Sequence, residues 1–228
     1  MKRSIGLECE GSVLSPMVYE EFDALPPGMY GAVLIDPPWN HDQWEGGGDR
    51  HPSRHYEVMG LEGIKGLPVS ECLAEDSVVF MWACYPMLPE AFEVLEAWGL
   101  QYRTVAFTWV KTNPKSGDIF MGCGSWTRAN PEVCLLATKG TPKRVHADVR
   151  QVIVAPRREH SRKPDEQYER VERLVRGPYL EVFARQERQG WDCLGKEVEK
   201  FGCDPTQFNF AEAVEAVADK PTTIAMEL

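Results

Sequence analysis

The feature that most constrains the fold is a short apolar run that ends abruptly at two prolines. Residues 32–35, Ala-Val-Leu-Ile, carry no polar side chain, which is typical of a strand buried on both faces of a sheet. The run continues directly into Asp36-Pro37-Pro38-Trp39, and the prolines prevent the strand from extending further. In open α/β sheets, ligands bind at the carboxyl ends of the strands. We therefore expect a ligand site around Asp36 and Trp39.

Strand-like and helix-like segments alternate along the rest of the chain. A second buried strand is expected at 77–82, and further strands are expected at 102–110, 133–138, 152–155 and 179–184. Helices are expected at 89–98 and 164–175. Pro89 and Pro164 each stand at the first helical position, and Gly99 follows the first of these helices as a C-terminal cap. Strands separated by helices at these intervals require crossover connections. The pattern predicts an α/β fold with a mostly parallel, doubly wound sheet.

The 228 residues are consistent with one domain and a short tail. Hydrophobic residues make up 43%, and no Pro/Gly-rich linker divides the chain, so we predict a single domain over residues 1–200. Residues 201–228 form a C-terminal tail in which one short helix, 211–218, is expected. The sequence contains no apolar stretch of membrane-spanning length and no signal-peptide core. It also contains no pair of cysteines with C-x-x-C spacing. We expect a cytoplasmic protein without membrane contact, disulfide framework or zinc ribbon.

Three histidines of one long predicted loop, His41, His51 and His55, raise the question of a metal site. Zinc sites draw on cysteine, histidine and acidic side chains at short, regular spacings. No cysteine or acidic residue recurs at such a spacing here, so no metal is expected.

Charge is distributed unevenly along the chain. The net charge of −10 argues against a protein that coats nucleic acid through charge alone. Residues 139–176 contain 11 Lys and Arg against 6 Asp and Glu, a net charge of +5, whereas the rest of the chain carries −15. Arg157, Arg158 and Arg162 lie in this segment and are the candidates for contacts with nucleic-acid phosphates. A solvated surface would account equally well for the composition.

The chemistry that suits residues 36–39 is the attack of an exocyclic nucleobase amine. Such an amine is a poor nucleophile because its lone pair is delocalised into the ring. The Asp36 carboxylate and the Pro37 carbonyl can accept its two N–H groups, and Trp39 can stack on the base. The structural alternative is a strand-ending turn with a buried tryptophan.

Residues 36–39 are one of several blocks that together resemble a known family. The others, in order, are Tyr56-Glu57-Val58-Met59, Phe80-Met81-Trp82, Trp109-Val110-Lys111-Thr112-Asn113, Gly124-Ser125-Trp126, Lys139-Gly140, Ser161-Arg162-Lys163-Pro164-Asp165-Glu166 and Glu181-Val182-Phe183-Ala184-Arg185. Between about residues 30 and 198 their order and spacing resemble the MT-A-seventy family of S-adenosylmethionine-dependent N6-adenine methyltransferases. That family includes the catalytic subunit of the messenger-RNA adenosine methyltransferase. The resemblance implies a Rossmann-like class I methyltransferase fold, permuted so that the catalytic strand before Asp36 precedes the cofactor strand, residues 179–184.

The resemblance also implies roles for individual residues. The catalytic candidates are Asp36, Pro37, Pro38 and Trp39. The candidates for binding S-adenosyl-L-methionine are Lys163 at its methionine carboxylate, Arg185 beside its ribose, Asp36, and the pair Lys196 and Glu197. Lys196 departs from the family pattern, which has asparagine at this position. The substrate candidates are Tyr56, Lys111, Trp126, Glu132, Arg157, Arg158 and Arg162. For Lys163, Arg185, Tyr56 and Glu132, a solvated or packing role is the alternative.

The function implied is methyl transfer to N6 of adenine in nucleic acid. DNA in a bacterial or phage setting is favoured over RNA, because the chain is short and has no zinc fingers. The alternatives are an RNA N6-adenosine methyltransferase, a non-catalytic methyltransferase-like partner subunit, and an enzyme acting on another amine, such as cytosine N4 or a protein glutamine. Asp36, where related enzymes for other amines have Asn or Ser, favours adenine. A homodimer or a methyltransferase-like partner subunit are both possible assemblies.

Overall fold

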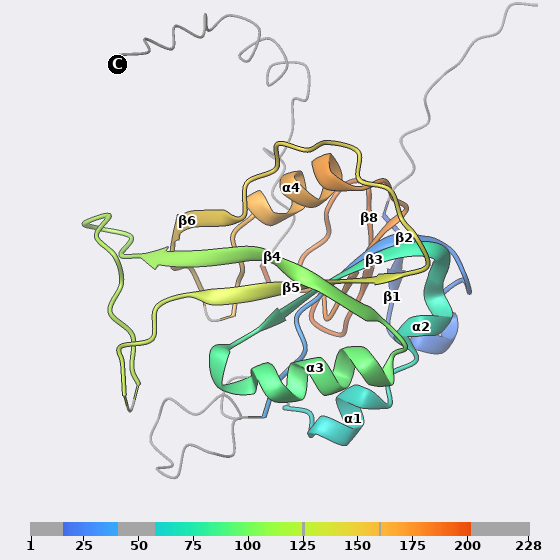
Figure 1. The fold of residues 1–228 in the computed structure, drawn as a ribbon, viewed down its shortest axis with the longest axis horizontal. Helices are drawn as coiled ribbons and strands as arrows, with labels where there is room; N and C mark the ends of the chain where they lie inside the picture. Colours follow the sequence, from blue (N-terminus) through green and yellow to red (C-terminus); the bar gives the residue numbers. More distant parts are fainter. Residues whose placement is uncertain (1–15, 41–57, 125, 160, 202–228) are drawn as a thin grey trace, which may run out of the picture.

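One mixed sheet organises the residues that this computed structural model describes, which are 16–40, 58–124, 126–159 and 161–201 (Figure 1). Its strands lie in the order β1-β8-β7-β2-β3-β5-β4-β6. Their bounds are Val18–Tyr19 (β1), Tyr30–Ile35 (β2), Leu73–Ala83 (β3), Gln101–Thr112 (β4), Glu132–Lys139 (β5), Val152–Pro156 (β6), Tyr179–Val182 (β7) and Trp191–Leu194 (β8). Strand β5 runs antiparallel to both neighbours, and the other pairings of the described sheet are parallel. The predicted mostly parallel sheet is confirmed.

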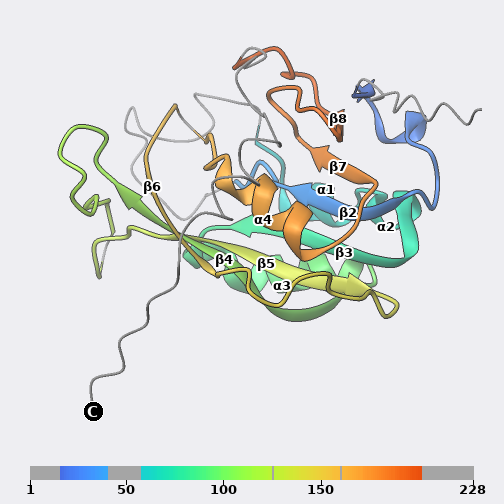
Figure 2. The ribbon, with the colours of Figure 1, turned by 90° about the horizontal axis from the view of Figure 1, so that it is seen from above.

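Helices cover both faces of the sheet, so the fold has three layers (Figure 2). The helices are α1 (Leu61–Lys65), α2 (Val69–Cys72), α3 (Leu88–Ala97) and α4 (Glu166–Leu174), with short 3-10 turns η1 (Phe22–Ala24) and η3 (Tyr85–Met87). On β2, Val33 and Ile35 belong to the apolar core beneath α1 and α3. The alternate residues Ala32 and Leu34 belong to the core beneath α4. Strand β2 is therefore buried on both faces, as its unbroken apolar run predicts.

Several predicted boundaries need correction. Pro164 does not occupy the first position of α4, because that helix begins at Glu166 with Asp165 as its N-cap. Strand β7 ends at Val182, since Phe183 has a φ of 61°, outside the extended region. Strands β1 and β8 and helices α1 and α2 were not predicted. The predicted helix 211–218 and the three loop histidines lie outside the described residues.

The carboxyl ends of β2, β7 and β3 meet at one edge of the sheet. Ile35 at the end of β2 pairs in parallel with Val182 of β7 and with Met81 of β3. The chain segments that follow these strands therefore face a common space, which contains the candidate site. In the part of the chain that the structure describes, no helix has the length and apolarity needed to cross a membrane. The same residues contain no cluster of three or more His, Cys, Asp or Glu suited to a metal ion.

Candidate active site

The turn after β2 is fixed by three hydrogen bonds. The Trp39 N–H donates to the Pro37 carbonyl over 2.8 Å, and the Met59 N–H donates to the Pro38 carbonyl over 2.9 Å. The Trp39 indole Nε1 donates to the carbonyl of Trp82, on β3, over 3.0 Å. Trp39 is only 5% exposed. Because the prolines and these bonds fix the backbone, Asp36 and the face of Trp39 have set directions.

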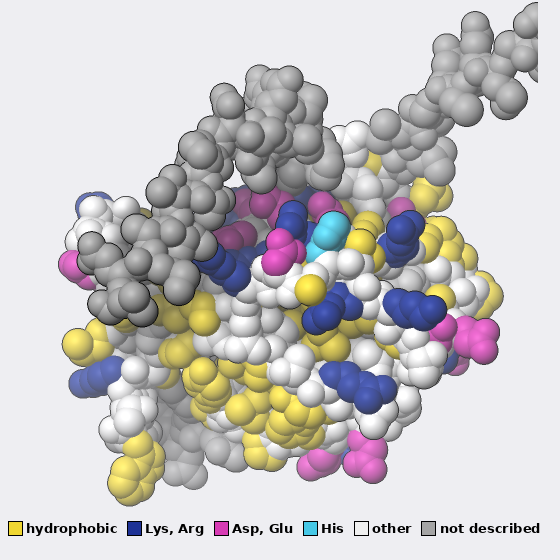
Figure 3. Space-filling model, turned by 45° about the horizontal axis from the view of Figure 1, so that its top comes forward, with side chains coloured by type: hydrophobic (Ala, Val, Ile, Leu, Met, Phe, Trp, Pro, Cys, Tyr) yellow, Lys and Arg dark blue, Asp and Glu magenta, His cyan; other side chains and the backbone are white. Residues whose placement is uncertain are grey.

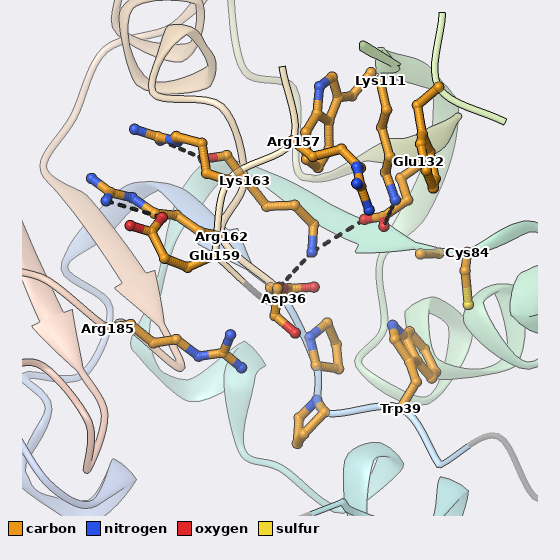
Figure 4. Close-up of a pocket in the computed structure, with 17 residues that line it drawn as sticks. Asp36, Trp39, Cys84, Lys111, Glu132, Arg157, Glu159, Arg162, Lys163 and Arg185 are labelled. Atoms are coloured by element: carbon orange, nitrogen blue, oxygen red, sulfur yellow. Dashed lines mark hydrogen bonds and ion pairs between the residues drawn. The ribbon is translucent and has the colours of Figure 1, made fainter. Parts of the chain in front are cut away.

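Three charged side chains from distant segments converge beside this turn (Figure 4). The Lys163 Nζ donates to Asp36 Oδ2 over 2.6 Å and lies 3.3 Å from Glu132 Oε2. The other oxygen of Glu132, Oε1, accepts a short hydrogen bond from Lys111 Nζ. Asp36 follows β2, Glu132 begins β5 and Lys111 is near the end of β4, so the sheet assembles the network. Lys163 reaches it from the connection between β6 and α4.

This network determines the charge states of its members. Burial alone would lower the pKa of Lys163, but the carboxylates of Asp36 and Glu132 outweigh that effect and raise the pKa above its usual value. For Glu132 burial acts in the opposite direction and would raise the pKa, but the positive charges of Lys163 and Lys111 lower it to about 2. At neutral pH Lys163 and Glu132 are therefore both ionised. The site holds its charges in fixed positions without exposing them fully to solvent.

A cavity of about 290 Å³ opens over this network. Its walls include Cys84, Trp109 and Phe120, which were not among the predicted site residues. Trp109 and Phe120 are aromatic surfaces, and Lys111 Nζ lies 5.0 Å from the centre of the Trp109 ring. The predicted site residues that line the cavity are Asp36, Pro37, Pro38, Trp39, Lys111, Glu132, Arg157, Arg158, Arg162, Lys163 and Arg185. Most of the predicted residues are therefore neighbours in space.

A second cavity, of about 470 Å³, lies beside the first at the ends of β7 and β8. Pro38 and Arg185 line both cavities. The remaining walls of the second include Lys196, Glu197 and apolar side chains such as Phe183 and Met59. Arg185 Nε lies 3.5 Å from Glu197 Oε2. The cofactor candidates Arg185, Lys196 and Glu197 thus group around one cavity.

The basic residues of the connection between β6 and α4 have different surroundings. The Arg157 guanidinium stacks 3.8 Å from the centre of the Phe120 ring. Arg158 forms an ion pair with Asp165, 2.6 Å apart, and Arg162 donates to Gln186 over 3.1 Å. On the face that carries α4, basic side chains lie beside acidic ones (Figure 3). The positive charge of this segment is therefore partly neutralised locally.

Two predicted substrate residues are not among those that line the first cavity. Trp126, in the connection between β4 and β5, is 99% exposed and does not line the cavity. Tyr56 lies outside the described residues. The other predicted site residues line one or both of the two cavities.

The sequence pattern that defines the MT-A70 family matches residues 30–197. This range includes the ion network, the whole lining of the first cavity and most of the lining of the second. The chain belongs to the MT-A70 family. It is 36% identical over 175 residues to an Arabidopsis thaliana protein named N(6)-adenosine-methyltransferase MT-A70-like, covering 75% of this chain and 24% of that relative. It is 31% identical over 177 residues to the human N(6)-adenosine-methyltransferase catalytic subunit METTL3, covering 75% of this chain and 29% of METTL3.

Another relative is matched over most of its own length. The Type II methyltransferase M.MunI from Mycoplasma sp is 29% identical over 201 residues, which are 78% of this chain and 82% of M.MunI. The chain spans only about a quarter of the length of the plant relatives that it matches.

Beneath the MT-A70 site lies a polar layer that sequence reasoning missed. Glu181 on β7 accepts hydrogen bonds from the Tyr168 hydroxyl at both carboxylate oxygens, each over 3.0 Å. The Trp82 indole donates to Gln167 Oε1 over 2.7 Å. Burial raises the pKa of Glu181 to about 7. The available signal was an acidic residue inside an otherwise apolar predicted strand, and such a residue needs a partner.

Proposed function

We propose that the chain is an N6-adenine methyltransferase that uses S-adenosylmethionine and acts on nucleic acid, with DNA preferred to RNA. The observation that carries the proposal is the position of the Asp36 carboxylate. It stands at the carboxyl end of β2, on the wall of a cavity that also contains Trp39 and the Lys163 ammonium. Membership of the MT-A70 family, with relatives named N(6)-adenosine-methyltransferases, supports the same reaction.

Two adjoining cavities suit a transfer between two bound molecules. We assign the acceptor base to the cavity above Asp36, and the adenosyl part of the cofactor to the cavity at the ends of β7 and β8. The second cavity offers the apolar side chains of Phe183 and Met59 for a purine, and Arg185 and Glu197 for ribose hydroxyls. These residues fit S-adenosylmethionine, which supplies an electrophilic methyl group when bound.

Lys163 is suited to hold the cofactor's methionine carboxylate. Its ammonium has three N–H donors, and Asp36 and Glu132 engage two of them. Two carboxylates already neutralise this cation, so a third anion gains less from it than from a free lysine. We therefore expect Lys163 to contribute direction as well as charge.

The chain's own groups act on the acceptor amine. Asp36 accepts one N–H and the Pro37 carbonyl accepts the other, which draws the nitrogen toward tetrahedral geometry. The Pro37 carbonyl already accepts the Trp39 N–H, and its second lone pair remains for the amine. Trp39 stacks on the base with its ring held by the bond to Trp82. The methylated nitrogen is positively charged and acidic, so no base is needed before attack.

The acceptor adenine must leave the base stack or be presented single-stranded, because its N6 is not accessible to the enzyme within a stacked duplex. Arg157 and Phe120 at the cavity wall offer a cation and an aromatic ring to the strand. The exposed Trp126 offers a second stacking surface. What supports the proposed preference for DNA is the similarity to the Type II methyltransferase M.MunI, which is 29% identical over 201 residues.

An assembly with a second methyltransferase-like chain, identical or different, is part of the proposal. Besides Trp126, large apolar side chains are more than half exposed on the β4–β5 connection and on the edge strand β6: Ile119, Met121, Val152 and Val154. Exposed apolar groups concentrated in one region favour contact with another protein. The edge strand β6 adds unpaired backbone groups to this region.

The test is nucleoside mass spectrometry after incubation with isotopically labelled cofactor and matched DNA and RNA oligonucleotides, each single-stranded and double-stranded. We expect labelled N6-methyladenine, with more in DNA than in RNA, and none from Asp36→Ala. Labelled N4-methylcytosine as the main product would contradict the assignment of the acceptor. Absence of any product, together with no heat of cofactor binding in calorimetry, would instead indicate a non-catalytic partner subunit.

A further inference from the structure

The lysine at the centre of the site is carried by an irregular connection. Lys163 belongs to neither β6 nor α4 but to the chain between them. Two residues before it, Ser161 has a φ of 64°, a conformation that is unfavourable for a residue with a side chain. Regular backbone hydrogen bonding therefore does not fix Lys163, and contacts from outside the regular elements must hold it in place.

Arg158 supplies such contacts with both amino groups of its guanidinium. Nη1 donates to Asp165 Oδ2 and Nη2 to Asp165 Oδ1, each over 2.6 Å. Nη2 also donates to the backbone carbonyl of Lys163 over 2.9 Å. Asp165 is the N-cap residue of α4. Arg158 thus ties the start of the connection to its end and binds the backbone of Lys163 directly.

The geometry of this pair favours a positioning role over an electrostatic one. A bidentate arginine–carboxylate pair fixes direction as well as distance, because both partners are planar. The Arg158 and Asp165 side chains are each only 28% exposed. Lysine, by contrast, has a flexible stem of four carbons, so the place of its ammonium depends on where its backbone is held.

Arg157, the adjacent residue, provides the contrast. Its guanidinium stacks on Phe120 at the cavity wall and forms no ion pair within the described ranges. Neighbouring arginines of the same connection are therefore in different states. Arg158 binds the Asp165 carboxylate and the Lys163 carbonyl, whereas Arg157 lies at the cavity wall with its guanidinium on the Phe120 ring.

We propose that Arg158 is a positioning residue that sets the place of the Lys163 ammonium between Asp36 and Glu132. This assignment replaces the expectation that Arg158 contacts phosphate. That expectation stays a prediction for Arg157 and Arg162. The positioning role of Arg158 rests on the proposed function only in its consequence for cofactor binding, which assumes that Lys163 binds the cofactor. The positioning itself concerns contacts within the protein and can be tested without cofactor or nucleic acid.

The first measurement is the acylation rate of Lys163 by an amine-reactive reagent, followed by peptide mass spectrometry on the full chain without ligand. The Lys163 side chain is 10% exposed in an intact network, so it should react slowly in the unsubstituted protein. Arg158→Ala should raise the rate several-fold, and Arg158→Lys should do nearly the same because lysine cannot bind in a bidentate manner. Arg170→Ala is the matched control, since it removes an arginine–carboxylate pair with Glu166 on α4 that does not contact Lys163.

The second measurement compares cofactor affinity and nucleic-acid affinity. Arg158→Ala should weaken binding of S-adenosylmethionine roughly tenfold to hundredfold, the range for loss of a hydrogen bond to a charged group. The salt dependence of its binding to a DNA oligonucleotide should stay unchanged. Arg157→Ala should leave cofactor affinity unchanged and reduce the log–log salt slope by about 0.7 to 0.9, the value for one phosphate contact.

Two outcomes would overturn the positioning role. One is an unchanged Lys163 acylation rate in a folded Arg158→Ala protein, and the other is a loss of salt slope equal to that of Arg157→Ala. If Lys163→Ala does not weaken cofactor binding, the proposed cofactor role of Lys163 fails, while the acylation result still decides the role of Arg158. Asp165→Asn retains the arginine and weakens its pair, and it provides the same test if Arg158→Ala does not fold.

Discussion

Glu181 should make the stability of the fold depend on pH in a direction opposite to that of most carboxylates. Its side chain lies beneath the active site, where Tyr168 donates to both of its oxygens. Burial, with a further contribution from the nearby Asp36 charge, raises its pKa from 4.5 to about 7, although Tyr168 and Arg188 act in the opposite direction. The folded protein therefore holds this proton more tightly than the unfolded chain does.

The magnitude follows from linkage between protonation and folding. Between about pH 4.5 and pH 7 the folded state binds more protons than the unfolded state, so the free energy of unfolding falls as pH rises. At about 1.4 kcal/mol for each pH unit, the loss amounts to about 3 kcal/mol by pH 8. Below the unfolded-state pKa both states are protonated, so the free energy of unfolding no longer changes with pH through this group.

Glu181→Gln isolates this contribution, because the amide oxygen still accepts from Tyr168 but no longer titrates. We expect the variant to gain about 3 kcal/mol relative to the unsubstituted protein between pH 4.5 and pH 8. Urea unfolding of both proteins across this pH range measures the difference. If the difference in unfolding free energy is the same at both ends of the range, the carboxyl group titrates normally and our account of its surroundings is wrong.

Three further substitutions test the frame of the site. Glu132→Gln should reduce the loss of stability in acid. A carboxyl whose pKa is lowered to about 2 stabilises the fold above its unfolded-state pKa, and this stabilisation is lost as pH falls. Urea unfolding of both proteins at several acidic pH values measures the difference. Trp39→Phe removes the donor to the Trp82 carbonyl and should cost about 1–3 kcal/mol in urea unfolding, whereas an unchanged midpoint would show that the bond is dispensable. Gly195→Ala should lower the melting temperature and weaken cofactor binding, because its Cβ would lie 2.5 Å from the Ala184 carbonyl oxygen. Calorimetry with and without cofactor measures both effects, and no change would show that the segments after β7 and β8 can move apart.

Strong local signals made the centre of the fold predictable. The apolar run of residues 32–35 could only be buried, and the following prolines marked its end, so β2 and the edge at Asp36 followed from the sequence. Strand β8 escaped prediction because Trp191–Leu194 is short and contains Asp192. Helices α1 and α2 contain five and four residues, too few for a helical period to emerge.

For the candidate site, the sequence indicated which residues could act but not how they pair. Lys163 was expected to meet a cofactor, yet only the folded chain brings it within 2.6 Å of Asp36, 127 positions away. The charge of residues 139–176 was visible in the sequence. That Arg158 is held by Asp165 while Arg157 stacks on Phe120 was not, because the partners of a surface charge depend on side-chain directions. Glu181 was missed for a similar reason.

The central claim, that Asp36 acts on the acceptor amine, is tested most directly by single-turnover methyl transfer. Protein saturated with labelled cofactor is mixed with a single-stranded DNA oligonucleotide that contains one adenine, and transfer is followed by mass spectrometry. Asparagine at position 36 has nearly the same shape but lacks the charge and presents a donor, so Asp36→Asn should slow transfer by about 10²–10³ or more while cofactor stays bound. Transfer by Asp36→Asn within a few-fold of the unsubstituted protein would contradict the claim.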